Sequence, residues 1–304
     1  MLFNINKNNN LELIGEHPFK LEKEIQELTE NNLMLIFNLN LIKSEFSINN
    51  FRIDSLAFDK ENNSFVIIEY KRNKNFSVVD QGYAYLSLLL NNKADFILEY
   101  INKFNKTVRK EDFDWSQTKV IFVAPEFTTY QKEAINFKDL PIELWEIKRY
   151  NDNSISYFQI QKSNSKESIK TVSKQDEVFE QVSKEIIIYT EEEHLAKFSD
   201  EIKELYDNLR SLILDIGEIE IKPKKHYIAF VSGTNITDVH IQQKGLKIWI
   251  NMQKGQLEDS RNMARDVSSI GKWGNGDYEL QLKSEDELDY VINLIKQSYK
   301  KNKK

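Results

Sequence analysis

Short apolar runs alternate with amphipathic stretches along the first half of the chain. Residues 21–37 place apolar side chains at helical spacing above an acidic outer face, and they predict a helix that is interrupted at Asn31–Asn32. Residues 77–90 predict a helix with Ser77 as its N-cap, and residues 128–137 predict another. Short β-like runs bounded by turn formers predict strands at 41–48, 51–58, 64–70, 119–125, 142–149 and 155–161.

The order of these elements differs from the strict alternation of a doubly wound sheet. It favours an α/β domain over residues 1–161, with a mixed sheet flanked by helices. Residues 162–177 are polar and predict a linker. Residues 178–304 predict a smaller α+β domain. Its expected elements are a long helix at 191–216, strands near 227–231, 237–242, 246–252 and 278–282, and a final helix at 284–300.

Composition agrees with two folded domains and narrows the possible chemistry. The 304 residues are 30% charged and 40% hydrophobic, as in ordinary globular proteins. The chain has no cysteine, which excludes disulfides, zinc–thiolate sites, iron–sulfur clusters and a cysteine nucleophile. The four histidines stand singly, so a zincin-like helix is not supported. Any metal must therefore sit on oxygen or histidine ligands.

Charge and hydropathy bear on partners and location. The net charge is −6 and neither half is strongly basic, so tight nucleic-acid binding by bulk charge alone is not indicated, although local basic clusters remain compatible with it. No apolar stretch reaches the roughly 18 to 20 residues of a membrane span, and the N-terminus lacks the features of a signal peptide. We therefore expect a soluble, cytoplasmic protein without a membrane partner.

The predicted strand at 64–70 ends in charged residues, within the sequence SFVIIEYKRNKN. The pattern Glu-x-Lys is uninformative alone, because it occurs at 69/71, 146/148, 201/203 and 220/222. The first copy differs in its context: Glu69 closes the apolar run FVII, and Asp54 lies on the preceding strand across a short turn. Because residues i and i+2 of a strand share a face, Glu69 and Lys71 should project together while Tyr70 enters the core.

Two neighbouring carboxylates repel each other, and a hard divalent cation bound between them offsets this repulsion. Mg²⁺ or Mn²⁺ is the natural candidate here. Such a cation polarises a phosphoryl oxygen and lowers the pKa of a bound water, and the Lys71 ammonium can orient that water or offset phosphate charge. On the helix that follows, Gln81 and Tyr85 stand at i, i+4 on one face. Together these residues predict a site for phosphodiester hydrolysis.

This arrangement resembles the PD-(D/E)XK nuclease superfamily, with QGYAY at 81–85 matching the Q-x-x-x-Y helix of its RecB-like and exonuclease-like branches. Three segments resemble a narrower group of bacterial proteins in which such a nuclease domain precedes a small uncharacterised C-terminal domain. These segments are RIDSLAFD, VIIEYKRNKNFSVVDQGYAYL and KADF. The phrases YIAFVSGTNITDVHIQQKGLKIWIN and GKWGNGDYEL are similar to that second domain. The resemblance spans most of the chain and implies a restriction-endonuclease-like fold.

The resemblance also implies roles for individual residues. Asp54 and Glu69 would bind the metal with the Tyr70 backbone carbonyl, Lys71 would assist the attacking water, and Gln81 and Tyr85 would hold substrate or position the lysine. Glu24, on the first helix, would be an accessory acid.

Some of these assignments stay open. The acid on the first helix could equally be Glu22, Glu27 or Glu30, and Glu45 at the end of a strand is a further candidate. The superfamily's first acid usually follows a proline, whereas Ile53 precedes Asp54 here. Arg72 and Lys74 could contact substrate phosphates, or they could belong to a solvated loop.

Two main functions are compatible with the sequence. One is a Mg²⁺-dependent deoxyribonuclease that acts on DNA in repair or in defence against foreign DNA. The other is an inactive nuclease-fold protein, with Asp54, Glu69 and Lys71 as a surface ion-pair set, that binds nucleic acid or a partner. The basic sequences at 222–226 and 298–304 and the aromatic sequence KWGNGDY at 272–278 could form a binding surface, for a protein partner or a homodimer, or could simply be solvated. A third, weaker possibility is a phosphohydrolase that acts on small nucleotides. Such an enzyme would be expected to have a glycine-rich phosphate loop or a His–Asp cluster, and neither is evident in this sequence.

Overall fold

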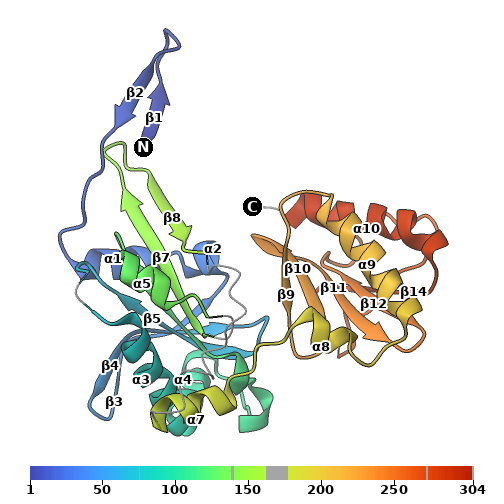
Figure 1. The fold of residues 1–304 in the computed structure, drawn as a ribbon, viewed down its shortest axis with the longest axis horizontal. Helices are drawn as coiled ribbons and strands as arrows, with labels where there is room; N and C mark the ends of the chain where they lie inside the picture. Colours follow the sequence, from blue (N-terminus) through green and yellow to red (C-terminus); the bar gives the residue numbers. More distant parts are fainter. Residues whose placement is uncertain (75, 138–139, 162–176, 272, 303–304) are drawn as a thin grey trace. The chain divides into compact units, whose positions relative to one another are not determined.

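The chain forms two compact units, Met1–Ile187 and Ile188–Lys304, coloured blue to yellow and yellow to red in Figure 1. The computed structural model describes residues 1–74, 76–137, 140–161, 177–271 and 273–302. The linker expected at 162–177 therefore lies, except for Glu177, outside the described residues. The sequence predicts no helix at 177–185 and assigns residues from 178 onward to the second domain. Helix α7 (Glu177–Glu185) instead belongs to the first unit, because Val182 and Ile186 are buried in that unit's core.

The first unit is built on a six-stranded mixed sheet with the order β3-β4-β5-β6-β7-β8. Its strands are β3 (Asn40–Ile48), β4 (Phe51–Asp59), β5 (Ser64–Tyr70), β6 (Lys119–Ala124), β7 (Ile142–Arg149) and β8 (Ile155–Gln159). The first three pair antiparallel, β5, β6 and β7 run parallel, and β8 returns antiparallel to β7. The mixed α/β class predicted from the sequence is confirmed.

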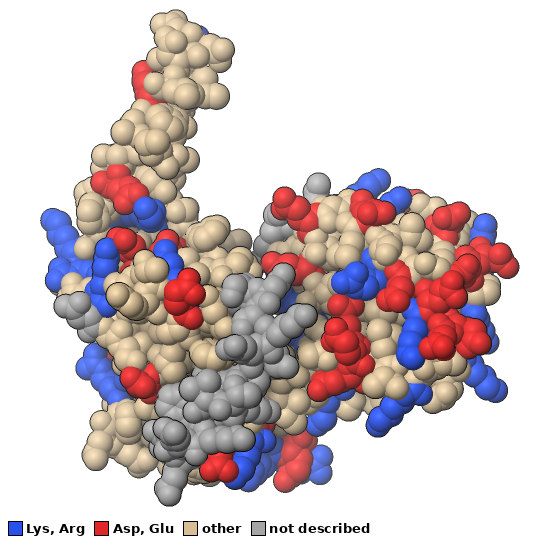
Figure 2. Space-filling view, in the orientation of Figure 1, with Lys and Arg blue, Asp and Glu red and all other residues tan. Residues whose placement is uncertain are grey.

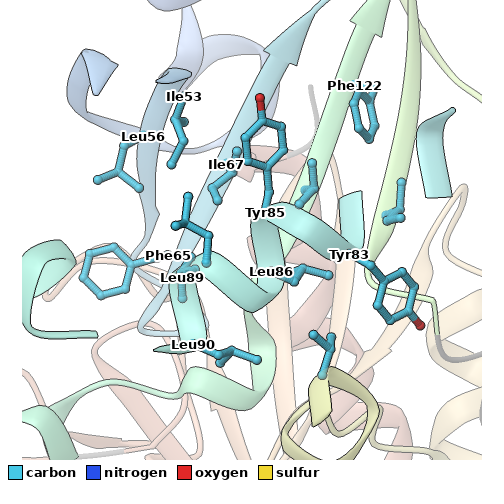
Figure 3. Close-up of a cluster of buried hydrophobic side chains, with 14 of the residues drawn as sticks. Ile53, Leu56, Phe65, Ile67, Tyr83, Tyr85, Leu86, Leu89, Leu90 and Phe122 are labelled. Carbon is cyan, nitrogen blue, oxygen red and sulfur yellow. The ribbon is translucent and has the colours of Figure 1, made fainter. Parts of the chain in front are cut away.

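Helices cover both faces of this sheet. Phe65 and Ile67 of β5 pack in one core, whereas Val66, Ile68 and Tyr70 pack in the other. Helices α1 (Glu22–Glu30) and α2 (Leu33–Phe37) cover the Tyr70 side, and α3 (Val78–Asn91) and α4 (Lys93–Phe104) cover the Phe65 side, part of which Figure 3 shows. Burial on both faces explains why the middle of β5, residues 65–68, is a continuous apolar run rather than an alternating one.

Sequence patterns located most of these elements. The break at Asn31–Asn32 separates α1 from α2, and the Ser77 hydroxyl accepts a hydrogen bond from the Asp80 amide at the start of α3. Helix α5 (Thr129–Ala134) is shorter than expected. The sequence patterns did not predict α4, α7, the 3₁₀ turns η1 (Lys110–Asp112) and η2 (Trp115–Gln117), or a hairpin of β1 (Leu2–Ile5) and β2 (Leu11–Ile14). The hairpin was missed because its apolar side chains are exposed rather than packed in a core.

The second unit has a six-stranded antiparallel sheet with the order β13-β14-β12-β11-β10-β9. Its strands are β9 (Glu220–Pro223), β10 (Ile228–Ser232), β11 (Thr234–Gln242), β12 (Gly245–Ile250), β13 (Arg265–Asp266) and β14 (Tyr278–Leu282). Helices α9 (Asp200–Leu214) and α10 (Leu288–Asn302), the latter after the turn η4 (Glu285–Glu287), pack on one face around a shared apolar core. This unit has the predicted α+β character.

One prediction for the second unit is wrong. The helix expected at 191–216 is two helices, α8 (Glu191–Leu195) and α9. Ser199 is extended at the start of α9, and Asp200 and Glu201 in its first turn favour a new helix N-terminus there.

The exposed charges are mixed in sign. On the face drawn in Figure 2, lysine and arginine side chains are interspersed with aspartate and glutamate, in agreement with the modest net charge. Within the part of the chain that the structure describes, no helix combines the length and apolarity needed to cross a membrane.

Candidate metal centre at the ends of two strands

The ends of β4 and β5 bring Asp54 and Glu69 together. The antiparallel register between the strands runs from Asp59 opposite Ser64 to Ser55 opposite Ile68, and stops before these two acids. Beyond that point side chains replace the backbone ladder: the Asp54 amide donates to Glu69 Oε1 at 3.2 Å, and the Tyr70 amide donates to Asp54 Oδ2 at 3.0 Å. Each carboxylate is thereby fixed to the backbone of the opposite strand.

Lys71 completes this group. Its Nζ lies 3.3 Å from Glu69 Oε2, and its backbone amide donates to the Val123 carbonyl at 2.9 Å, which anchors the residue beside β6. The Tyr70 side chain points to the opposite core, where its hydroxyl lies 3.0 Å from that of Ser55. The two-residue period of β5 thus places Glu69 and Lys71 together and Tyr70 apart, as predicted.

Burial disfavours the ionised form of both carboxylates. Glu69 is 2% exposed, and burial raises its pKa to about 7; the Asp54 charge adds to the rise, while Lys71 opposes it. Burial also raises the pKa of Asp54, against the lowering effects of the Tyr70 amide and Lys71. Because one lysine does not cancel the cost of ionising buried Glu69 beside half-buried Asp54, a further cation would stabilise the ionised form of both acids.

The five acids proposed to assist the site occupy different environments. Charges on Glu45 and Glu22 raise the pKa of Asp54, so these two side chains act electrostatically on the site. Glu22 accepts a hydrogen bond from the Arg72 amide at 2.9 Å, and Glu45 pairs with Arg52 and Lys23.

Glu24, named first from the sequence, is engaged elsewhere. Its Oε1 accepts hydrogen bonds from the Lys20 and Leu21 amides at the start of α1, and its Oε2 lies 3.2 Å from the Arg149 guanidinium. The structure therefore gives Glu24 a helix-capping and ion-pairing environment rather than a place beside Asp54. Glu27 has no contact with the carboxylate pair among the described hydrogen bonds and ion pairs.

Helix α3 brings Tyr85 to the same group. Gln81 Nε2 lies 3.5 Å from the Tyr85 hydroxyl, which donates to the Arg52 carbonyl at 3.4 Å. Burial raises the pKa of Tyr85, and the neighbouring Glu69 charge raises it further. Figure 3 shows the Tyr85 hydroxyl pointing away from the apolar side chains around Leu86 and Leu89. The face shared by Gln81 and Tyr85 therefore reaches the strand ends.

The two predicted phosphate contacts lie on the segment after β5. The Arg72 guanidinium donates to the Lys20 carbonyl at 2.7 Å, which ties it to the entry of α1. Lys74 Nζ lies 2.6 Å from Glu126, and both side chains are largely exposed. Such a solvated pair contributes little stability, so Lys74 can exchange its partner for a phosphate more readily than Arg72.

Gln26 was missed by the sequence analysis. It is 4% exposed, and its Nε2 donates to the Asp54 carbonyl at 3.0 Å, to Ser44 at 3.2 Å and to Glu30 at 3.0 Å. Glu30 accepts the Ser55 hydroxyl at 2.6 Å, which links this network to the strand end. A polar stripe of Gln26, Thr29 and Glu30 at helical spacing beside the apolar stripe of α1 is the signal that could have revealed it.

The donor set fits a hard divalent cation. Among the described residues no group of three or more His, Cys, Asp or Glu side chains is arranged to hold a metal, so a cation here would rely on two carboxylates. Mg²⁺ commonly binds through one or two carboxylates and keeps several waters. Buried Glu69 and half-buried Asp54 can supply these two carboxylates.

The other copies of Glu-x-Lys confirm that the tripeptide alone is uninformative. Glu146 and Lys148 on β7 pair with Lys132 and Glu16 rather than with each other. Lys203 on α9 pairs with Asp200. Glu220 and Lys222 do pair, at 3.0 Å, but both are largely exposed.

Comparison with known proteins gives one extensive match. Over 295 residues the chain is 51% identical to an uncharacterized protein of Haemophilus influenzae, and the match covers 97% of this chain and 98% of that protein. Residues 191–302 also match the family model of a domain of unknown function, DUF5655.

Three solved structures resemble parts of the chain. A repair endonuclease from Pyrococcus abyssi is 20% identical with a TM-score of 0.25, and the match covers 43% of this chain and 50% of that one. A complex of EndoMS with double-stranded DNA is 20% identical with a TM-score of 0.29, covering 45% and 50%. SfsA of Pyrococcus furiosus with Ca²⁺ is 13% identical with a TM-score of 0.24, covering 45% and 61%. The chain spans about half the length of the first two, and at these TM-scores the likenesses carry no functional argument.

Proposed function

We propose that this chain, which belongs to one family with the uncharacterized Haemophilus influenzae protein, is a divalent-metal-dependent nuclease that hydrolyses DNA phosphodiester bonds. The observation that supports the proposal most is the pair of half-buried Asp54 and buried Glu69, each fixed to the other's strand, with Lys71 on Glu69. Structural ion-pair sets are normally compensated or exposed, whereas Glu69 is buried and its pKa is raised to about 7 by burial and by the Asp54 charge, despite the neighbouring Lys71.

In this proposal Asp54, Glu69 and the Tyr70 carbonyl hold Mg²⁺ or Mn²⁺. When bound, the cation supplies Lewis-acid polarisation of a phosphoryl oxygen and a more acidic water. Lys71 donates a hydrogen bond to the attacking water or to a phosphate oxygen, where its charge offsets the charge that develops in the transition state. The β6 contact of its amide restricts where the ammonium can lie.

Other residues position the reactants. Tyr85 and Gln81 line the α3 side of the pair, and the Tyr85 hydroxyl can orient Glu69 or a substrate oxygen. Arg72 and Lys74 contact phosphates that flank the cleaved bond, and such contacts fix register without reading sequence. Repair of DNA and defence against foreign DNA are both compatible with this chemistry.

A cleavage panel tests the proposal. Wild-type protein is incubated with single-stranded, duplex and branched DNA in Mg²⁺, Mn²⁺ or a chelator, beside Glu69→Ala and Lys71→Ala. We expect metal-dependent fragments from the wild type, and a loss of roughly 100- to 1000-fold or more in each variant, because each removes a group that acts on the reacting atoms.

The chain offers a matched control for this panel. Glu146→Ala and Lys148→Ala alter the same tripeptide on β7 of the same sheet, where the two side chains pair elsewhere, and they should cleave as the wild type does. Cleavage by Glu69→Ala and Lys71→Ala at the wild-type rate would exclude the proposed site. A wild type that binds DNA without cutting any substrate would favour the alternative, an inactive nuclease-fold protein.

A further inference from the structure

A groove of about 310 Å³ opens next to the candidate metal centre, between the segment that joins β5 to α3 and the N-terminus of α5. Phe76, Val79 and Ala134 form its apolar lining, and Lys74 and Tyr130 stand at its border. Its volume lies at the lower end of the range for small-molecule sites, so it suits one planar group rather than a chain of them.

Lys71 lies close both to the groove's lining and to the candidate metal centre. Lys71 Nζ lies 5.9 Å from the centre of the Phe76 ring, on one side, and 3.3 Å from Glu69, on the other. The segment that carries Lys74 and Phe76 begins at Lys71 itself. A substrate phosphate at Lys71 would therefore bring its neighbouring nucleotide to the groove.

Gln131 fixes the two walls relative to each other. Its Nε2 donates to the Lys74 and Phe76 carbonyls at 3.1 and 2.9 Å, while its Oε1 accepts from the Thr128 amide at 2.8 Å. Because this side chain is buried and bonded to both walls, the groove is formed before any ligand arrives. A preformed site loses little conformational entropy on binding.

The lining suits a nucleobase with an attached phosphate. Tyr130 is 89% exposed, so its ring faces solvent at the groove's border and does not pack in the hydrophobic core. Aromatic rings accept the face of any base, and apolar walls exclude water from the other face. Lys74 needs to give up only its exposed pairing with Glu126 to meet a phosphate.

We propose that this groove binds one unpaired nucleobase beside the scissile phosphate, and that the preferred substrate of the chain is therefore single-stranded DNA or a single-stranded end. The inference rests on the proposed nuclease function for the position of the scissile phosphate. A base inside a duplex is stacked and paired, and entering the groove would require unstacking it at a cost of a few kcal/mol. An unpaired base offers its faces without that cost.

Equilibrium binding tests this inference without relying on cleavage. The full chain is titrated, in a chelator that prevents cutting, into a fluorescently labelled single strand and into the matching duplex, and anisotropy is recorded. We expect tighter binding of the single strand, weakened roughly 5- to 100-fold by Tyr130→Ala and restored by Tyr130→Phe, which keeps the ring. Phe158→Ala, which removes a 61% exposed ring on β8 outside the groove, should bind as the wild type does.

The binding results test the nucleobase subsite independently of the proposed nuclease activity. Equal loss for single strand and duplex in Tyr130→Ala, no loss in either, or no binding of the single strand by the wild type would overturn the subsite, even if the protein cuts DNA. Selective loss in Tyr130→Ala, restored by the phenylalanine, supports the subsite even if no fragments appear with Mg²⁺ or Mn²⁺. Circular dichroism melts of all variants establish that each one is folded.

Discussion

Glu69 accepts a hydrogen bond from the backbone amide of Asp54 at 3.2 Å, and the Asp54 carboxylate accepts one from the amide after Glu69 at 3.0 Å. This reciprocal exchange holds two carboxylates together where the β4–β5 ladder ends. The backbone amides and Lys71 lower the pKa values that burial and mutual repulsion raise, but they do not restore them. A further cation beside these strand ends would stabilise the ionised form of both acids.

The stability of the metal-free protein should depend on the ionisation of Glu69. Its pKa rises from 4.5 to about 7 on folding, so the native state favours the protonated acid. The resulting stability is complete below the unfolded pKa and is lost as pH rises through the folded value. Glu69→Gln lacks this loss, and relative to wild type it should gain on the order of 3 kcal/mol between pH 4 and pH 8.

Urea unfolding of both proteins in a chelator, at several pH values, measures this difference. Parallel stability curves for wild type and Glu69→Gln across the whole range would show that Glu69 keeps an ordinary pKa. Tyr157→Phe, which removes a hydrogen bond to Thr29 on the other face of the sheet, should run parallel to the wild type and serves as the control.

Gln26 should act as a positioning residue for Asp54. Its amide bonds the Asp54 carbonyl, so Gln26→Leu frees that strand end and leaves the part-buried oxygens of Ser44 and Glu30 without this donor. We expect a loss of about 1–3 kcal/mol in stability. We also expect Mn²⁺ to bind roughly 10-fold or more weakly, because outer contacts orient metal ligands.

Calorimetric titration with Mn²⁺, combined with unfolding curves, separates these two effects. Tyr157→Phe is again the matched control, since it removes a hydrogen bond to the same helix without touching Asp54. If Gln26→Leu loses stability but binds Mn²⁺ with wild-type affinity, Gln26 has a structural role alone.

The accessory acid should be Glu22 or Glu45 rather than Glu24. Glu24→Gln keeps an oxygen for the Leu21 amide and loses only a partly exposed ion pair with Arg149, so its stability should change by less than about 1 kcal/mol and its cleavage should not change. Glu22→Gln and Glu45→Gln remove charges that act on Asp54. Each should therefore raise several-fold the metal concentration that half-maximal cleavage requires. Cleavage lost in Glu24→Gln alone would reverse this assignment.

The strand-level part of this site follows from sequence because a strand has a period of two. An apolar run that ends in Glu69, Tyr70 and Lys71 can place the acid and the lysine on one face only, and Asp54 on the neighbouring strand then falls beside them. The cap at Ser77 and the i, i+4 spacing of Gln81 and Tyr85 likewise depend on local geometry.

The side chains that helix α1 contributes to the site could not be predicted from sequence in the same way. Glu22, Glu24 and Gln26 lie within five residues on α1, and which of them faces the strands depends on the rotation of the helix against the sheet. That rotation is set by Ile25 and its neighbours in a core assembled from distant segments. The unit boundary was missed for a related reason: α7 follows a polar segment, yet Val182 and Ile186 belong to the first core.

The central claim is that Asp54 and Glu69 hold the divalent cation that DNA cleavage requires. The most direct measurement is the cleavage rate of a single-stranded DNA as Mn²⁺ is raised from zero, for wild type, Glu69→Gln and the control Glu146→Gln. We expect a rate that is absent in chelator and saturates with Mn²⁺ for the wild type and the control, with no saturable response in Glu69→Gln. Cleavage by the wild type without metal, or an unchanged Mn²⁺ response in Glu69→Gln, would contradict the account.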